Sequence, residues 1–469
     1  MNVKPHLAHA VDTARPALNL DDVVAEVREL ERVVTQDGIA RVFARRFAGR
    51  LRYCHHTEGW YCWRETHWQR DETKAAFEFV RVLAREVSEK GEARDLKEIR
   101  KTAFASGVDR FSRSDPALAV TSERWDLNPF LLGTPKGTVD LRSGRLRPGE
   151  PDDGITKVTA IGPANTADCP QWRQFIYETT NGNDGLARFL QQWTGYCLTG
   201  DISEHALFFG HGDGGNGKGI FVNTVNGIMA NYAAVAPPDT FTASQHDRHP
   251  AELAMLRGAR LVTASETEKG RAWAENRIKQ LTGGDPITAR FMRGNFFTFQ
   301  PTFKLTIIGN HQPTLENVDA STRRRFNIIP FEHKPQRPDP HLMDRLRSEW
   351  PAILRWMIDG CLDWQRSGLV RPGIVLEATA EYFEEQDLFG HWLAACCETV
   401  NPAAATSTSL LYDSWKSFAV KSGEKPGSHK AFGTAMEKRG FKRGRSGTSR
   451  FFRGVRLSLS DALVTHDAL

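Results

Sequence analysis

Long apolar runs are absent from this sequence, and so is an apolar segment near its beginning. A helix that crosses a bilayer needs roughly 18 consecutive apolar residues, so the sequence predicts no membrane-spanning protein. The first residues, MNVKPHLAHAVDTARP, also lack the apolar core of a secretory signal. We therefore expect a cytoplasmic protein without a membrane partner.

Cysteine is sparse, and the seven cysteines are scattered without the spacing of a disulfide framework. This usage favours a reducing compartment. The segment Cys54–Cys62, which also contains two histidines, suggests zinc, but no second pair of ligands follows at zinc-finger spacing. Three tryptophans close by, at positions 60, 63 and 68, favour a packed aromatic cluster instead.

Strong overall charge is also missing, although the charge is unevenly distributed. The 469 residues carry a net charge of +5, and their composition is that of an ordinary globular protein of two to four domains. Between Lys416 and Arg456, however, 12 Lys and Arg oppose only two acidic residues. Such a segment indicates contact with a polyanion, and a solvated basic tail is the alternative.

Internal repeats are absent, and local patterns divide the chain into five regions. Residues 1–50 predict an arm and a helix, and 51–190 combine an aromatic-rich segment, helices and small hairpins. In 191–345, strands and helices alternate, which is typical of a sheet layered with helices. Residues 346–400 are predicted to be helical, and a joint rich in Pro and Ala opens the basic region 401–469.

Glycines surround a single lysine in FFGHGDGGNGKGIF, residues 208–221, which contains the motif G-x-x-x-x-G-K. A short apolar strand (ALFFG) precedes it and an amphipathic helix (IFVNTVNGIM) follows, as this motif requires. Glycines let backbone N–H groups turn toward a β-phosphate, and the lysine reaches the β- and γ-phosphates. A glycine-rich turn without a ligand is the alternative. We predict an ATP site formed by Gly212, Gly214, Gly215, Asn216, Gly217, Lys218 and Gly219.

The position after the lysine departs from the usual motif, because Gly219 replaces the Ser or Thr that binds Mg²⁺. The metal must then take a water there or depend on acidic residues elsewhere. In ARLVTASETE, Glu266 falls at the exit of a buried strand and Glu268 follows. An Asp-Glu pair is commoner at the end of such a strand, and in this sequence Ser265 stands at the position of the Asp. We assign Mg²⁺ binding and polarisation of the attacking water to Glu266, with Glu268 as a second candidate.

Two further features follow along the chain. The apolar segment FKLTIIGN ends in Asn310, and a polar residue at such a strand tip can orient the attacking water. Three arginines, 323–325, then precede another strand, FNIIPF. Adjacent arginines usually form a solvated face, but in this succession they predict a finger that reaches the nucleotide of a neighbouring subunit.

With these motifs in this order, the sequence resembles the superfamily 3 helicases. The nearest branch is the phage and plasmid primase-helicases related to the poxvirus primase-helicase. Lys218 and Glu266 are 48 residues apart, and Asn310 follows after another 44. KQLTGGDPITAR resembles the extra motif of this superfamily. WDLNPFLLGTPKGTVDLRSGRL and CPQWRQFIYETT are similar to its helicase-associated region, so the resemblance covers roughly residues 50–400.

The resemblance implies an α/β fold with a P-loop, AAA+-like core. A mainly helical helicase-associated domain precedes this core, and a winged-helix domain follows it. Family members are ring-shaped hexamers that hold ATP between subunits and move 3′ to 5′ along single-stranded DNA, here in a bacterial host cell. Position by position, the resemblance implies that Gly215, Gly217 and Lys218 form the phosphate loop. It implies that Glu266 is the acidic residue and Asn310 the sensor, and that Arg324 or Arg325 is the arginine finger.

Two regions are candidates for contact with DNA. ITARFMRGNFFTF has a Gly-Asn turn between alternating segments and predicts a hairpin. Its Arg290 and Arg293, with Lys279 upstream, would bring cations to single-stranded DNA in a central channel, and an ordinary surface hairpin is the alternative. In the basic region, two helices and KRGRSGTSRFFRGVRL resemble a winged helix that binds duplex DNA. There the candidate contacts are Lys438, Arg439, Lys442 and Arg443.

A polymerising domain with paired aspartates is not recognisable in the sequence, so we expect unwinding without priming and a separate primase or replication initiator as partner. Two functions stay open. The first is a replicative helicase, and the second is an origin-binding or regulatory ATPase that assembles on DNA or melts it. A small-molecule P-loop kinase is disfavoured, because KQLTGGDPITAR, the arginine run and the basic region have no role in one.

Overall fold

The computed structural model describes residues 35–89, 97–243, 251–265, 271–291, 294–315, 319–399, 402, 404–423, 425–446 and 449–458. The predicted N-terminal helix lies outside these residues, as do Glu266, Glu268 and Arg293. The chain forms two compact units. The first comprises residues 1–314 and 324–376, and the second comprises 315–323 and 377–469.

The first unit is built around a parallel sheet of five strands in the order β14-β8-β13-β10-β9. Burial on both faces is nearly complete along β8, β10, β13 and β14, as expected for apolar strands covered by helices on both sides. The predicted apolar segments are therefore confirmed as neighbouring strands. They are β8 Leu207–His211, β10 Leu261–Ser265, β13 Lys304–Gly309 and β14 Phe326–Pro330. The edge strand β9, Ala233–Val235, was not predicted.

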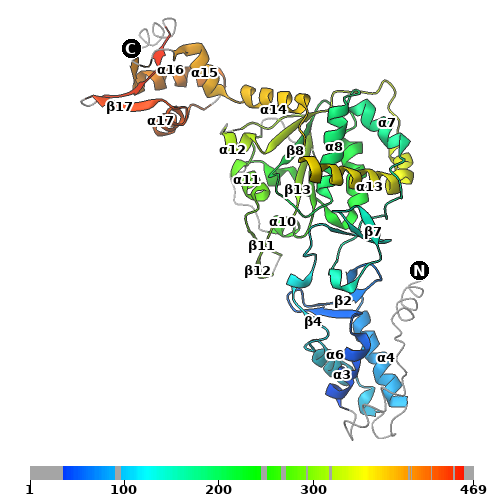
Figure 1. The fold of residues 1–469 in the computed structure, drawn as a ribbon. Coiled ribbons are helices and arrows are strands. Elements are labelled where there is room, and N and C mark those ends of the chain that lie inside the picture. Colours follow the sequence, from blue (N-terminus) through cyan, green and yellow to red (C-terminus); the bar gives the residue numbers. More distant parts are fainter. Residues whose placement is uncertain are drawn as a thin grey trace. The chain divides into compact units, whose positions relative to one another are not determined.

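Helices α7 (Pro170–Thr179), α8 (Asp184–Cys197), α9 (Lys218–Met229) and α13 (Leu342–Ser367) share the main hydrophobic core with this sheet. Helices α8 and α13 lie side by side (Figure 1). Their backbones touch at two glycines. A Cβ on Gly195 would lie 2.1 Å from the backbone nitrogen of Cys361, and one on Gly360 would lie 2.1 Å from the carbonyl oxygen of Gln191.

The N-terminal part of the first unit has a separate core. Its cluster of aromatic side chains is confirmed: the rings of Trp63 and Trp68 lie 5.5 Å apart, and Trp60 donates a hydrogen bond of 2.9 Å to Asp109. In residues 51–190, which the resemblance implied to be mainly helical, the small hairpins predicted from the sequence are confirmed as parts of two small sheets. The elements here are α3 Gln36–Phe47, β1 Leu51–Cys54, β2 Gly59–Trp63, β3 Trp68–Arg70, α4 Ala75–Glu89, α6 Thr102–Ser112, β4 Ala119–Val120, β5 Leu131–Thr134, β6 Gly137–Asp140 and β7 Arg145–Arg147.

Between β10 and β13 the chain forms α11 (Glu275–Gly283) and an antiparallel hairpin of β11 (Ile287–Arg290) and β12 (Phe296–Phe299). The hairpin predicted around the Gly-Asn turn is thus confirmed. Its two faces differ, because Ile287 and Ala289 are buried while Phe296 on β12 is 61% exposed.

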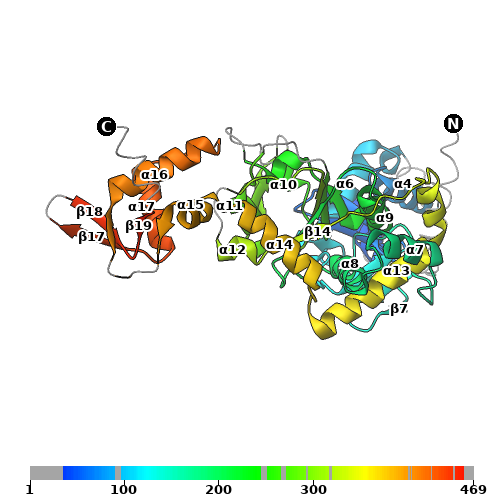
Figure 2. The same cartoon turned by 90° about the horizontal axis from the view of Figure 1, so that it is seen from above.

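The second unit packs three helices against a three-stranded antiparallel sheet in the order β16-β18-β17. Trp392, Trp415, Phe432, Met436 and Phe452 form the centre of its core. Figure 2 shows β17 and β18 extending beyond the helices of this unit. The elements are α15 Leu388–Cys396, β15 Cys397–Glu398, β16 Ala405–Ser407, α16 Thr408–Lys421, α17 His429–Lys438, β17 Lys442–Ser446, β18 Ser449–Arg453 and β19 Arg456–Leu457. Helix α14, Gly373–Glu385, runs from the first unit into the second.

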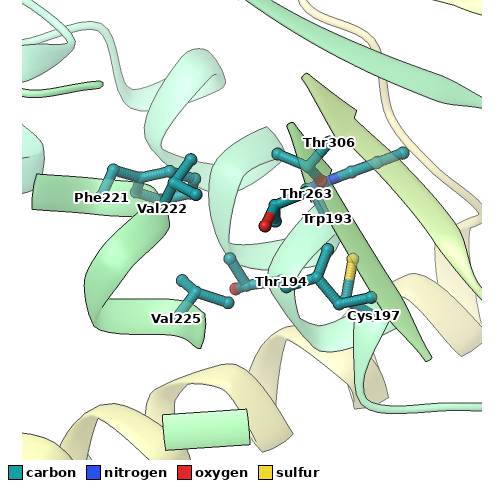
Figure 3. Close-up of a pocket in the computed structure, with 9 residues that line it drawn as sticks. Trp193, Thr194, Cys197, Phe221, Val222, Val225, Thr263 and Thr306 are labelled. Atoms are coloured by element: carbon teal, nitrogen blue, oxygen red, sulfur yellow. The ribbon is translucent and has the colours of Figure 1, made fainter. Parts of the chain in front are cut away.

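A small internal cavity of about 10 Å³ lies in the core between α8, α9 and strands β10 and β13 (Figure 3). Trp193, Thr194, Thr263 and Thr306 contribute to its wall, and the Trp193 indole donates a hydrogen bond of 2.9 Å to the Thr306 hydroxyl. This volume is about that of one water position and is too small for a substrate. Across the described part of the chain, no helix combines the length and apolar character needed to cross a membrane.

Candidate functional site

The candidate site lies at the carboxyl end of the parallel sheet. Strand β8 lies between β13 and β14, and the chain leaves β8 through α9 to reach β9 at the far edge. The order of strands therefore reverses at β8. In open α/β sheets the crevice at the carboxyl end of such a strand is where ligands bind. The predicted glycine loop connects β8 with α9 at this place.

The loop conformation depends on backbone that only glycine supplies without strain. Gly212, Gly215 and Gly217 have φ angles of 149°, 82° and 86°. At Gly212 a Cβ would lie 2.1 Å from the carbonyl oxygen of Phe331, directly after β14. The side-chain amide of Asn216 donates to that same carbonyl. Strand β14 and the loop are thus joined on one backbone group, which fixes the loop at the end of the sheet.

Lys218 begins α9 and has only 6% of its surface exposed. Its Nζ donates to the carbonyl oxygen of Gly212 and, at 2.9 Å, to the Asn216 side-chain oxygen. Burial lowers the pKa of Lys218, while the nearby Asp213 raises it and Lys334 lowers it further. Among the described residues, no carboxylate lies within ion-pair distance of this ammonium group. A bound phosphate would supply the missing negative charge and favour the protonated lysine.

A cavity of about 960 Å³ opens in front of the loop. Its floor is formed by Gly214–Gly219 and by the carboxyl ends of two strands, with Ser265 the last residue of β10 and Asn310 directly after β13. Two walls come from segments to which the sequence assigned no role at the nucleotide site. One is a side of α7, with Gln171, Gln174, Phe175, Glu178 and Thr179, and the other is formed by His333, Pro335, Arg337, Pro338, Asp339, Leu342 and Arg345.

The two walls are connected by side chains from α7 and α13. The Glu349 carboxylate accepts hydrogen bonds of 3.1 Å and 3.0 Å from the backbone N–H groups of Gln171 and Trp172, which caps α7. Arg345 donates a hydrogen bond of 2.8 Å to the Gln171 side chain and pairs with Asp339. The Arg345 guanidinium lowers the pKa of the Asp339 carboxyl. A ligand longer than a triphosphate therefore meets a preformed polar rim.

Oxygen donors suited to Mg²⁺ line the same cavity as Gly219, where the usual hydroxyl is missing. Apart from the backbone of α9 itself, no atom of the described residues lies within 4 Å of the position that a Cβ on Gly219 would take. Asn223, one turn along α9, lines the same cavity, as do Ser265 and Asn310. Mg²⁺ prefers oxygen ligands and retains several waters, so an open space with a few oxygen donors fits it. Glu266, the principal predicted ligand, follows Ser265 directly but lies outside the described residues.

The arginines predicted as a finger lie away from this cavity. They precede β14 and are therefore at the amino end of the sheet, whereas the cavity is at the carboxyl end. Arg324 is exposed, but Arg325 is only 8% exposed. The backbone carbonyl of Arg325 accepts a hydrogen bond of 2.7 Å from Leu207 at the start of β8. Arg324 can reach another molecule, while Arg325 belongs to the interior of its own unit.

The cations predicted to contact single-stranded DNA are only partly grouped. Arg290 is on β11, and its guanidinium lies 5.0 Å from the centre of the exposed Phe296 ring. Lys279 is half-buried on α11, and Arg293 lies outside the described residues. The Arg290–Phe296 pair combines a positive charge with an aromatic face, which are the two groups that contact single strands in proteins that bind them.

The four cations predicted to contact duplex DNA fall into two classes. Lys438 and Lys442 are exposed. Arg439 pairs with Asp387 and lies 5.1 Å from the centre of the Phe389 ring. Arg443 pairs with Glu437 at 3.2 Å and lies 5.6 Å from the ring centre of the buried Phe452. The two arginines hold their own unit together, so only the two lysines are available as predicted.

Two segments match families of known proteins. Residues 40–181 match the family described as "D5 N terminal like". Residues 210–325, from the glycine loop to the arginines, match a "Family of unknown function (DUF5906)".

Curated viral relatives are similar to more than half of the chain. A protein of Acanthamoeba polyphaga mimivirus named "Putative helicase" is 24% identical over 63% of this chain and 33% of its own length. A protein of Frog virus 3 with the same designation is 25% identical over 54% of this chain and 27% of its own length. The chain thus spans about a third or less of these relatives. Among solved structures, the C-terminal region of NrS-1 has a TM-score of 0.48 at 10% identity, covering 87% of this chain and 96% of that one.

Proposed function

We propose that the chain is the ATP-hydrolysing motor of a DNA helicase of the D5-like primase-helicase type, in the replication of a phage or plasmid. The observation that carries this proposal is the buried Lys218 in a glycine loop, at the mouth of a cavity of about 960 Å³. The segment matched to a D5 family and the relatives named as helicases support the assignment to helicases.

ATP would bind with its triphosphate on the loop. The N-terminus of α9 directs backbone N–H groups and a partial positive charge at the phosphates, and Lys218 adds a full charge. Lys218 would exchange its bonds to Gly212 and Asn216 for phosphate oxygens. The remaining volume between α7 and residues 333–345 is then available for the ribose and base.

Hydrolysis needs a positioned water and neutralised phosphate charge. Asn310 borders the cavity after β13 and would orient the water that attacks the γ-phosphate. Glu266 would polarise that water and, with Asn223 and Ser265 nearby, hold a hydrated Mg²⁺. When bound, Mg²⁺ would neutralise charge on the β- and γ-phosphates. The chain's own residues would thus bind the triphosphate, orient the water and accept its proton.

The proposed motor works as a ring, with each ATP between two copies. Support comes from the position of Arg324, which is exposed and precedes β14 at the end of the sheet opposite to its own cavity. An arginine placed there serves a neighbouring copy more readily than its own nucleotide. A closed hexamer would then surround single-stranded DNA, with Arg290 and Arg293 directed to the strand, and would move 3′ to 5′.

The second unit would hold duplex DNA as a winged helix. The order of its elements, α15, β16, α16, α17, β17 and β18, with β18 central in the sheet, supports this proposal. The same observation favours a second candidate function, in which the ATPase assembles on an origin or melts it without processive unwinding. The two functions differ in whether a fork is separated.

The test is ATP hydrolysis and strand displacement on forked DNA. Glu266→Gln should abolish both while ATP binding persists, because the amide retains its shape but cannot accept the proton of water. A substrate with a 3′ single-stranded tail should be unwound and one with a 5′ tail should not. Full turnover by Glu266→Gln would assign the catalytic role to another residue, such as Glu268. Hydrolysis without displacement by the unaltered protein would favour the second function.

A further inference from the structure

The hairpin of β17 and β18 is the most positively charged element in the described part of the second unit. Its two strands, KRGRS and SRFFR, contain five cations among ten residues and no carboxylate. Helix α17 contains Lys430 and Lys438 but also Glu437, which pairs with Arg443. By charge alone, the hairpin exceeds the helix as a surface for a polyanion.

The register of the hairpin sets cations opposite cations. Lys442 pairs across the strands with Arg453, and Arg445 pairs with Arg450. Like charges directly opposite each other in a sheet are destabilising by some tenths of a kcal/mol to about 1 kcal/mol. Two such rungs in one short hairpin are therefore unfavourable in the free protein. A polyanion that binds between them removes the cost.

The two cationic rungs project from opposite faces of the hairpin. Side chains alternate along a strand, so the Lys442–Arg453 rung lies on one face and the Arg445–Arg450 rung on the other. Phe452 shares the second face and is buried in the core, which fixes the orientation of the strands. A hairpin with cations on both faces fits a groove whose two walls are both negatively charged.

An aromatic ring supports the first face. Phe451 lies across Gly444 on the neighbouring strand, where a Cβ would come within 2.3 Å of the ring. The Arg453 guanidinium lies 5.7 Å from the centre of that ring. Stacking on the ring holds this guanidinium extended on the first face instead of leaving it to many rotamers. Less side-chain entropy is then lost when the guanidinium binds a phosphate.

At the alternative contact surface, the end of α17, Lys438 is exposed but Arg439 is held by internal bonds. Arg439 follows α17 and pairs with Asp387, whose side chain also accepts a hydrogen bond of 2.9 Å from the backbone of Gly390 at the start of α15. Arg439 therefore connects α17 with the N-terminus of α15. Releasing it to bind DNA would break this connection, and a partly exposed ion pair of this kind contributes up to about 1 kcal/mol.

We propose that the β17–β18 hairpin, and not α17, is the principal contact of this unit with double-stranded DNA, and that it enters a groove of the duplex. The major groove admits a two-stranded ribbon, and its walls are the two phosphate backbones. Lys442 and Arg453 would contact one backbone, and Arg445 and Arg450 the other. The inference rests on the proposed function in taking DNA as the polyanion, and the contacts are independent of sequence.

The experiment compares two variants of the full chain. The hairpin variant combines Lys442→Gln, Arg450→Gln and Arg453→Gln, all at exposed positions. The control combines Lys430→Gln and Lys438→Gln on α17 and removes two charges where the hairpin variant removes three, so the losses are compared per charge. Fluorescence anisotropy of a labelled duplex is measured at several salt concentrations. The hairpin variant should lose at least about tenfold in affinity, and its salt slope should fall by about 0.9 for each phosphate contact removed. The control should change much less.

Further measurements separate this inference from the function on which it rests. A charge-preserving variant, Lys442→Arg with Arg450→Lys and Arg453→Lys, should recover duplex affinity, which a folding defect would not allow. ATP hydrolysis stimulated by single-stranded DNA should be equal in all variants. An equal or larger loss in the α17 control would overturn the proposal, and so would single-stranded DNA that competes as well as duplex. If the hairpin variant bound duplex more weakly but the unaltered protein hydrolysed no ATP, the proposed motor would be refuted and the hairpin contact would be supported.

Discussion

The two ends of the parallel sheet each contain a buried lysine, and the surroundings of these lysines differ. Lys218 follows the carboxyl end of β8, beside the cavity of about 960 Å³. Lys304 begins the neighbouring strand β13, at the amino end, and is 2% exposed. Both ammonium groups donate to carbonyl or amide oxygens of the protein, which are neutral, instead of to carboxylates.

The partners of Lys304 are complete without a ligand. Its Nζ donates to the carbonyl oxygens of Thr199 and, at 3.1 Å, Asp201, and it lies 4.7 Å from the centre of the Tyr196 ring. Burial lowers the pKa of Lys304 to about 7. Lys218 has hydrogen-bond partners within its own loop and an open cavity on its other side. Burial and a lowered pKa are therefore shared by both lysines, and only the open side distinguishes a binding group from a structural one.

The largest expected effect concerns the arginines at the amino end. Arg324→Ala should reduce kcat for ATP by about 10³-fold to 10⁵-fold with nearly unchanged nucleotide affinity, as loss of an arginine finger does. Mixing Arg324→Ala with Lys218→Ala protein should restore part of the activity, because each copy supplies what the other lacks. Steady-state phosphate release on mixed samples measures this.

The control for that experiment is Arg325→Ala. Because Arg325 is buried, this variant should lower thermal stability instead of acting only on kcat. An Arg324→Ala protein with full activity, or a protein that stays monomeric with ATP and DNA, would refute the assignment in trans.

The second effect compares the two lysines directly. Lys218→Ala should weaken ATP binding by about tenfold to a hundredfold, because a charged hydrogen bond contributes about 1.5–3 kcal/mol. Lys304→Met should change the unfolding temperature and leave the ATP affinity of the folded protein as it was. Titration of a fluorescent ATP analogue and a thermal melt of each variant give both quantities. Weaker ATP binding by folded Lys304→Met would mean that the two ends of the sheet are not independent.

The smallest effect is a dependence of stability on pH at the amino end. In the unfolded chain a lysine keeps its proton to about pH 10.4, whereas folded Lys304 loses it above about pH 7. Between these values the unfolded state binds more protons, so raising the pH stabilises the fold, by at most about 1.4 kcal/mol per pH unit. Denaturant unfolding at pH 7 and 8 should show this rise, and Lys304→Met should lack it. Equal slopes in both proteins would assign the effect to other groups.

Much of the sheet could be predicted from the sequence, because its strands are continuous apolar segments followed by polar residues. FKLTIIGN and FNIIPF are examples, and the glycine loop follows a third such strand. The Gly-Asn turn between alternating segments likewise indicated the β11–β12 hairpin. In each case the signal is local, and the strand, turn or loop is complete within about ten to fifteen residues of chain.

The remaining features depend on contacts between distant parts of the chain, which no local pattern reports. The capping of α7 by Glu349 joins residues 178 positions apart. The pairing of Arg439 with Asp387 could not be predicted either, because the sequence showed only how many positive charges the basic segment contains and Asp387 lies outside that segment. The sequence therefore indicated the floor of the cavity but not its walls. From the sequence, Arg439 and Arg443 were expected to contact DNA, but both are paired with carboxylates of their own unit.

The glycines where α8 meets α13 affect how the sequence of this protein can diverge. At Gly195 and Gly360 an added Cβ would meet backbone atoms of the opposite helix. Side chains can be exchanged in pairs, with a smaller one compensating for a larger neighbour, but backbone cannot shrink. Neither position can therefore be rescued by a second substitution across the interface. In this contact, substitutions are therefore tolerated at the residues around the two glycines but not at the glycines themselves. A larger residue at either glycine requires α8 and α13 to move apart.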